Sequence, residues 1–128
     1  MRREVLGLPW KLQSDRPIWV QLAEVLTQRI VSGQYPAGIR IPSVRDLAAD
    51  AGVNPNTMQR ALTALEERGL VSAQRNTGRF VTEDEALITA TRKTLAQKEL
   101  SVFCEKMRQL GFDAGELAQL LQTKGESK

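Results

Sequence analysis

The sequence contains no histidine, and this absence excludes several kinds of chemistry. Histidine is the commonest general base and transition-metal ligand, and Ser–His and Cys–His nucleophile pairs require it. The chain also has no glycine-rich phosphate loop and no evident pair of carboxylates in a pocket. We therefore expect a binding protein with no cofactor and no metal, and not an enzyme.

Cysteine, aromatic residues and long apolar segments are also scarce. The single cysteine cannot form an internal disulfide, which fits a reducing cytoplasm. Six aromatic residues make an aromatic-rich sugar or lipid site a poor candidate. The apolar runs are far shorter than the roughly 20 residues that span a bilayer, and the first residues do not resemble a signal peptide. The 128 residues predict one cytoplasmic domain with an appendage and no membrane contact.

The positive charge is concentrated in the first part of the chain. Residues 1–82 carry eleven basic and seven acidic residues, whereas 83–128 carry seven basic and eight acidic ones. Ten of those eleven basic residues are arginine, whose planar guanidinium suits phosphates and guanine edges. This charge distribution is compatible with a nucleic-acid partner and equally with an ordinary, unevenly charged surface. The motifs described below show where in the fold the arginines are expected.

Two short helices joined by a tight turn are predicted at about residues 43–68. An S-x-x-D capping arrangement begins at Ser43, and Gly52 ends the first helix after about two turns. Asn54 is a strong N-cap and Pro55 suits the first position of the second helix. The apolar stripe of the second helix comprises Met58, Ala61, Leu62 and Leu65. This arrangement is a helix-turn-helix.

The flanking segments extend this motif to a winged helix. A helix is expected from Ile18 to about Ser32, after a short edge strand or extended arm at residues 8–17. Short strands LVSAQ and RFVT surround RNTG, which predicts a hairpin, the wing, at about 70–82. The fold class is therefore mainly α with a small β-hairpin. Residues 1–82 form the DNA-binding domain, and 83–128 form a two-helix tail interrupted at Gly111.

One side of this domain collects side chains that can bind DNA. On a helical wheel, Asn56, Gln59, Arg60 and Thr63 lie opposite the apolar stripe, and Thr57 lies on the flank. Out of context, this face could be an ordinary solvated helix surface. The predicted fold places further basic residues on the same side, namely Arg45, Arg75 and Arg79. Additional candidates for phosphate contacts are Arg2, Arg3 and Arg40.

The run from Ile18 to Val81 resembles the winged-helix domain of GntR-type bacterial transcription regulators. The motifs that carry the resemblance are PSVRDLA, GVNPNT and the wing ending GRFV, in the expected order and spacing. The GVNPNT variant and the short tail are most similar to the YtrA subfamily, whose members lack a large ligand-binding domain and dimerise through two C-terminal helices.

The resemblance implies specific roles in DNA binding. Arg45 would read a guanine, Ser43 would contact phosphate, and Gly78 would bring the wing backbone against the minor groove. The residues that would line the recognition helix are Asn56, Thr57 and Gln59, and Asn54 is a further candidate for DNA binding. Two positions depart from the family pattern: Pro55 stands where many relatives have arginine, and Asn76 replaces the first wing glycine.

The tail has an apolar face that a second copy of the chain could cover. The interface candidates are Leu95, Val102, Phe103, Met107, Leu110, Leu117, Leu120 and Leu121. Thr91 and Lys98 interrupt the heptad pattern, so a mixed helical interface is expected and not a long coiled coil. Packing of the tail on its own winged domain is the alternative. Cys104 is expected to be a structural thiol, with redox sensing as the alternative.

The sequence thus predicts a homodimeric repressor that binds double-stranded DNA at an inverted repeat. The alternative is a winged-helix module that binds proteins and not DNA, against which Arg45 and Arg60 argue. The residues identify no small-molecule effector, operator sequence or regulated gene.

Overall fold

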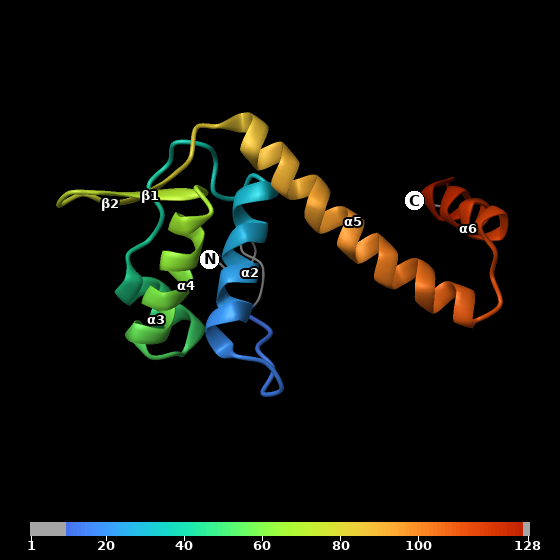
Figure 1. Cartoon of the computed structure of the whole chain (residues 1–128), viewed down its shortest axis with the longest axis horizontal. Helices are drawn as coiled ribbons and strands as arrows, with labels where there is room; N and C mark the ends of the chain where they lie inside the picture. Colours follow the sequence, from blue (N-terminus) through green and yellow to red (C-terminus); the bar gives the residue numbers. More distant parts are fainter. Residues whose placement is uncertain (1–9, 127–128) are drawn as a thin grey trace. The chain divides into compact units, whose positions relative to one another are not determined.

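A computed structural model of the chain describes residues 10–126, which divide into two compact units (Figure 1). The first unit extends to Arg92 and the second begins at Lys93. The elements are α2 (Ile18–Val31), α3 (Val44–Ala51), α4 (Pro55–Glu67), β1 (Val71–Gln74), β2 (Gly78–Val81), α5 (Glu85–Gln109) and α6 (Ala114–Glu126). Among residues 10–126, no helix is both long and apolar enough to cross a membrane.

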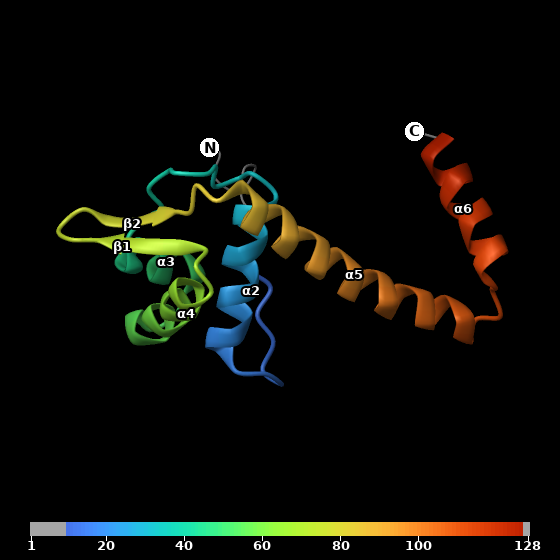
Figure 2. The same cartoon turned by 45° about the horizontal axis from the view of Figure 1, so that its top comes forward.

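The core of the first unit lies between α2 and the helix-turn-helix. Helices α2 and α4 lie side by side, and α3 packs on α4 (Figures 1 and 2). The apolar stripe predicted for α4 is confirmed, because Met58, Ala61, Leu62 and Leu65 are all completely buried. Leu22 and Leu26 of α2 are buried to the same degree. Each such large side chain contributes about 1.5–3 kcal/mol through burial, so this interface holds the recognition helix in place.

Side-chain caps set the boundaries of α3 and α4 as the sequence predicts. The hydroxyl of Ser43 accepts a hydrogen bond from the backbone N–H of Asp46 at 3.1 Å. The side chain of Asn54 accepts one from the N–H of Asn56 at 2.7 Å, and Pro55 follows it as the first residue of α4. Gly52 ends α3 with a φ of 72°, a left-handed conformation that glycine adopts without steric cost. The predicted helix-turn-helix is confirmed.

The wing is a two-stranded antiparallel hairpin, and a third segment of the chain pairs with its second strand. Strands β1 and β2 pair in the register Val71↔Val81 to Gln74↔Gly78. Residues 38–41 lie along the other side of β2, where Ile41 donates its N–H to the Arg79 carbonyl at 3.0 Å. Val81 in turn donates to the Ile39 carbonyl at 2.9 Å. The hairpin is confirmed, whereas this third segment was not predicted from the sequence.

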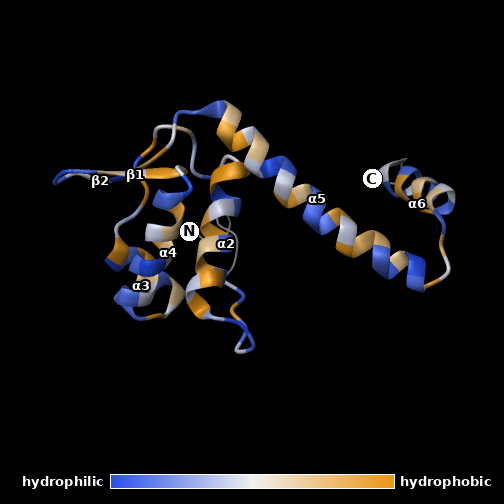
Figure 3. Ribbon diagram, in the orientation of Figure 1, coloured by the Kyte–Doolittle hydropathy of each residue, from blue (hydrophilic) through white to orange (hydrophobic). Residues whose placement is uncertain are grey.

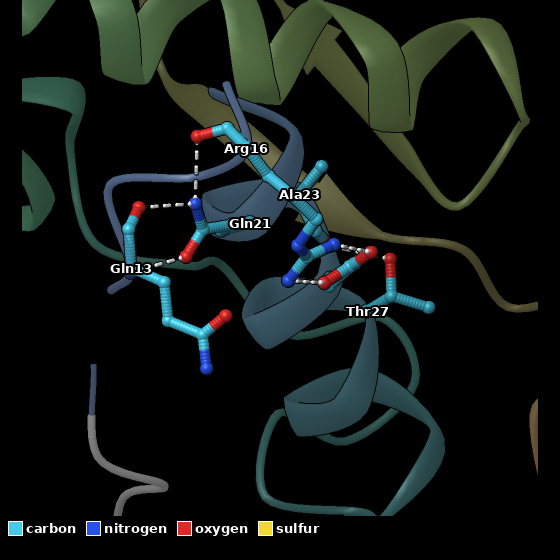
Figure 4. A network of polar contacts seen from close by, with 6 residues as sticks. Gln13, Arg16, Gln21, Ala23 and Thr27 are labelled. Atoms are coloured by element: carbon cyan, nitrogen blue, oxygen red, sulfur yellow. Dashed lines mark hydrogen bonds and ion pairs between the residues drawn. The ribbon is translucent and has the colours of Figure 1, made fainter. Parts of the chain in front are cut away.

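Residues 10–17 form an arm without helix or strand, and polar contacts hold it against α2 (Figure 4). The buried side chain of Gln21 accepts a hydrogen bond from the Gln13 N–H at 2.7 Å and donates to the carbonyls of Gln13 and Arg16. Arg16 also pairs with Glu24 at 2.9 Å, and this hydrogen bond raises the pKa of Arg16. Of the two expected forms, the extended arm is the one observed; positions 8 and 9 lie outside the described residues.

The first turns of α5 belong to the winged domain. Ile88 is buried, and the guanidinium of Arg92 donates to the Val31 carbonyl at 3.3 Å. The side chain of Asp84 caps the helix by accepting from the N–H of Leu87 at 3.1 Å. The compact unit therefore extends about ten residues beyond the boundary expected after Thr82.

The second unit contains the rest of α5 and α6. Gly111 separates the two helices as predicted, with a φ of 99°. The second capping arrangement is also confirmed: Glu116 N–H donates to the Asp113 carboxylate at 2.8 Å, and Asp113 N–H donates to Glu116 at 3.0 Å. Among residues 114–125 of α6, Leu117 alone is buried, and hydrophobic positions recur along both helices (Figure 3).

Candidate nucleic-acid interface

The N-terminal half of α4 exposes three polar residues, Asn56, Gln59 and Arg60, which we call the polar face. It lies opposite the buried stripe, so packing of the stripe against α2 fixes the direction in which the polar face points. Thr57 and Thr63 are half-buried and lie at its edges, so Thr63 is less accessible than the helical wheel suggested. Amides and guanidinium groups of this kind pair with base edges and phosphates.

Arg60 is held in place by an aromatic ring. Its guanidinium carbon lies 4.4 Å from the centroid of Trp19, in the first turn of α2. Such a cation–π contact is worth about 0.5–1 kcal/mol at exposed sites. It restricts the rotamers of Arg60 while its charge stays at the surface. This pair could not be predicted from the sequence, because the two residues are 41 positions apart and belong to different helices.

Ser43 and Arg45 lie at the N-terminus of α3, next to α4. Ser43 serves as the N-cap, and its exposed hydroxyl still has a proton to donate. Arg45 is exposed and forms no ion pair among residues 10–126, so its guanidinium is available to a ligand. The side chain of Asn54 is engaged in its cap, which leaves its amide nitrogen to contact a partner.

The two arginines predicted on the wing have different surroundings. Arg75 is exposed in the hairpin turn. Arg79, in contrast, forms an ion pair with Glu66 of α4 at 2.6 Å, and its side chain is only 16% exposed. This ion pair joins the wing to the recognition helix and neutralises the Arg79 charge. Gly78 is exposed at the end of the turn with a φ of 105°.

A further arginine, Arg40, lies against the wing. A Cβ atom at Gly78 would lie 2.9 Å from the Arg40 Nε, so the guanidinium occupies the space beside this glycine. The sequence suggests Arg40 as a candidate for phosphate contact, but it does not predict that Arg40 lies next to the wing. Arg2 and Arg3, the other two such candidates, lie outside the described residues.

Most residues predicted for the dimer interface are accessible in the second unit. Those with exposed side chains are Val102, Phe103, Leu110, Leu120 and Leu121. Leu95 and Met107 are half-buried, as is Cys104, whereas Leu117 is buried. Leu100 is 54% exposed and was not singled out from the sequence. Within residues 10–126, no group of three potential metal ligands is found.

A helix-turn-helix followed by a hairpin defines a winged-helix domain, a DNA-binding class. Residues 19–81 match the family model described as bacterial regulatory proteins, gntR family. The uncharacterized HTH-type transcriptional regulator YhcF of Bacillus subtilis is 32% identical over 113 residues, which cover 88% of this chain and 93% of that protein. The chain belongs to the GntR family of bacterial transcription regulators, and it is not an enzyme.

Further relatives and solved structures are similar to this chain. The HTH-type transcriptional repressor YtrA of Bacillus subtilis is 29% identical over 102 residues, covering 80% of this chain and 74% of that protein. A GntR family transcriptional regulator from Listeria monocytogenes has a TM-score of 0.80 and 32% identity, covering 88% of this chain and 98% of that one. The DNA-binding domain of AraR, solved in complex with operator ORX1, has a TM-score of 0.55 and 25% identity and covers 59% of this chain and 98% of that one.

Proposed function

We propose that this GntR-family regulator is a repressor that binds an inverted-repeat operator as a homodimer. The observation that carries DNA binding is the exposed polar face of α4, which lies opposite the fully buried apolar stripe and near Arg45, whose exposed guanidinium forms no ion pair within residues 10–126. The similar AraR domain was solved on operator DNA, which supports DNA as the partner.

The proposed contacts follow the order of elements in the domain. Helix α4 enters the major groove, where Asn56, Thr57 and Gln59 face base edges and Arg60 faces a phosphate. Arg45 pairs with a guanine, since a bidentate guanidinium contact to O6 and N7 is the commonest specific contact in this groove. The hydroxyl of Ser43 and the amide of Asn54 donate to phosphates. From the wing, the backbone at Gly78 approaches the minor groove and Arg75 faces a phosphate beside it, while Arg79 acts mainly by fixing the wing to Glu66.

Two copies are needed because one winged helix reads too little sequence. A single small module buries about 600–1,000 Å² on DNA, which seldom selects one genomic site. A two-fold dimer doubles the contacts and matches an inverted repeat with half-sites about one helical turn apart. The exposed apolar side chains of α5 and α6 supply a surface that a second copy could cover, and Leu110, in the turn between the two helices, is 72% exposed.

The repressor assignment rests on the similarity to YtrA, which is named a repressor. A bound dimer that overlaps a promoter would exclude RNA polymerase without any further domain.

Two measurements test the proposal. Selection of duplexes from a randomised DNA pool by the full chain should enrich an inverted repeat, and light scattering should give twice the mass of the chain at micromolar concentration. The Arg45→Ala variant is the matched control, since it should dimerise normally but enrich the repeat less strongly, with relaxed selection at the guanine position. A pool without enriched sequence would refute DNA recognition, and a monomeric full chain would refute the dimer.

A further inference from the structure

The wing has two faces, and only one of them packs on the domain. Val71, Val81 and Arg79 share the face directed towards α4, as their burial and the ion pair of Arg79 with Glu66 show. Because side chains alternate along a strand, Gly78 and Phe80 lie on the other face. The cross-strand bridge Arg40↔Phe80 places Arg40 on that outer face as well.

Arg40 runs along this outer face towards the end of the hairpin. Its backbone stands opposite Phe80, but its Nε and Nη2 would lie 2.9 and 3.4 Å from a Cβ atom at Gly78, two residues nearer the turn. The absent side chain at Gly78 therefore makes room for the guanidinium against the wing backbone. Figure 2 shows the hairpin extending beyond α3 and α4, so this guanidinium lies on the projecting part of the domain.

No acidic side chain in the described part of the chain forms an ion pair with Arg40. The hairpin and its turn, residues 70–82, contain no Asp or Glu. Arg79, the arginine of the strand itself, is already neutralised by Glu66. The charge available at the end of the wing thus comes from Arg75 in the turn and from Arg40 on the outer face.

We propose that Arg40 is the arginine that the wing inserts into the minor groove, and that it makes the regulator prefer A·T-rich pairs next to each half-site. This inference rests on the proposed DNA binding and adds a residue that determines specificity. A narrow A·T minor groove has an enhanced negative potential that attracts inserted arginines, whereas the N2 amino group of guanine obstructs the floor of the groove. Arginine suits this position better than lysine because its guanidinium is more weakly hydrated.

The test uses the full chain and the duplexes that it recovers from a randomised pool. The base pairs on the wing side of each half-site are made A·T, G·C or inosine·C, and the dissociation constant is measured for each flank. The wild-type chain should bind the A·T flank about fivefold or more tightly than the G·C flank. The inosine·C flank should behave like A·T, since inosine lacks the N2 amino group in the minor groove.

Arg40→Ala should abolish this preference, and Arg40→Lys should reduce it while retaining most of the affinity for the G·C flank. Arg75→Ala is the matched control: it removes the same charge from the wing and should weaken all three duplexes equally. Circular dichroism melts of each variant report whether the domain remains folded.

A flank preference that survives in Arg40→Ala would overturn the inference and leave the proposed function intact. So would a wild-type chain that binds A·T and G·C flanks equally. Failure to recover any sequence from the pool would instead refute the proposed function, and the inference with it.

Discussion

Truncation within α5 tests where the winged domain ends. A chain ending at Arg92 keeps every residue of the first unit, whereas one ending at Glu83 loses the first turns of α5. Ile88 is only 6% exposed, so its removal costs about 1.5–3 kcal/mol, and the half-buried Leu87 adds about half as much. The shorter chain should therefore be about 2–4 kcal/mol less stable. For a domain of this size, each kcal/mol lowers Tm by roughly 4–8 °C.

Thermal melts followed by circular dichroism measure this difference directly. We expect both truncated chains to be monomeric by light scattering, and the chain ending at Arg92 to melt at least about 10 °C above the other. The matched control is Leu87→Ala with Ile88→Ala in the chain ending at Arg92, which should lose most of the same stability. Equal melting temperatures for the two truncations would refute the assignment of these turns to the domain.

Four substitutions test other parts of the account. Leu62→Ala should lower the free energy of unfolding by about 2–5 kcal/mol, because Leu62 is completely buried. Gln59→Ala, on the polar face, should leave the free energy of unfolding nearly unchanged in a chemical denaturation. The reverse order would contradict the orientation of α4. Arg45→Ala should weaken binding to the selected duplex by about 1–3 kcal/mol and binding to random DNA much less. Equal losses on both DNAs would indicate that Arg45 contacts a phosphate and not a base. Trp19→Leu keeps the charge of Arg60 but removes its contact with the aromatic ring. The affinity for the selected duplex should therefore fall, while the salt dependence of this affinity should not change. An unaltered affinity would contradict a positioning role for the ring.

Features set by local interactions were predictable from the sequence. The boundaries of α3 and α4 follow from Ser43, Gly52 and Asn54, each of which acts within three residues of its own position. The hairpin turn could be predicted because Asn76 and Gly78 adopt positive φ angles at little cost.

Long-range pairings were not predictable in this way. The segment containing Arg40 has the composition of a loop, and its pairing with β2 depends on residues about forty positions away. The same applies to the ion pair of Arg79 with Glu66, which depends on how the wing and α4 lie against each other. The extension of the domain to Arg92 was missed because the periodicity of α5 is continuous and does not indicate which turns pack on another element.

Fluorescence anisotropy of the full chain on labelled DNA tests sequence-specific DNA binding most directly. The selected duplex and a scrambled duplex of the same composition are titrated at salt concentrations from about 50 to 200 mM. We predict that the selected duplex binds at least about 1,000-fold more tightly, and that log affinity falls linearly with log salt by about 0.9 per phosphate contacted. Equal affinity for the two duplexes, or an affinity that does not change with salt, would contradict the account.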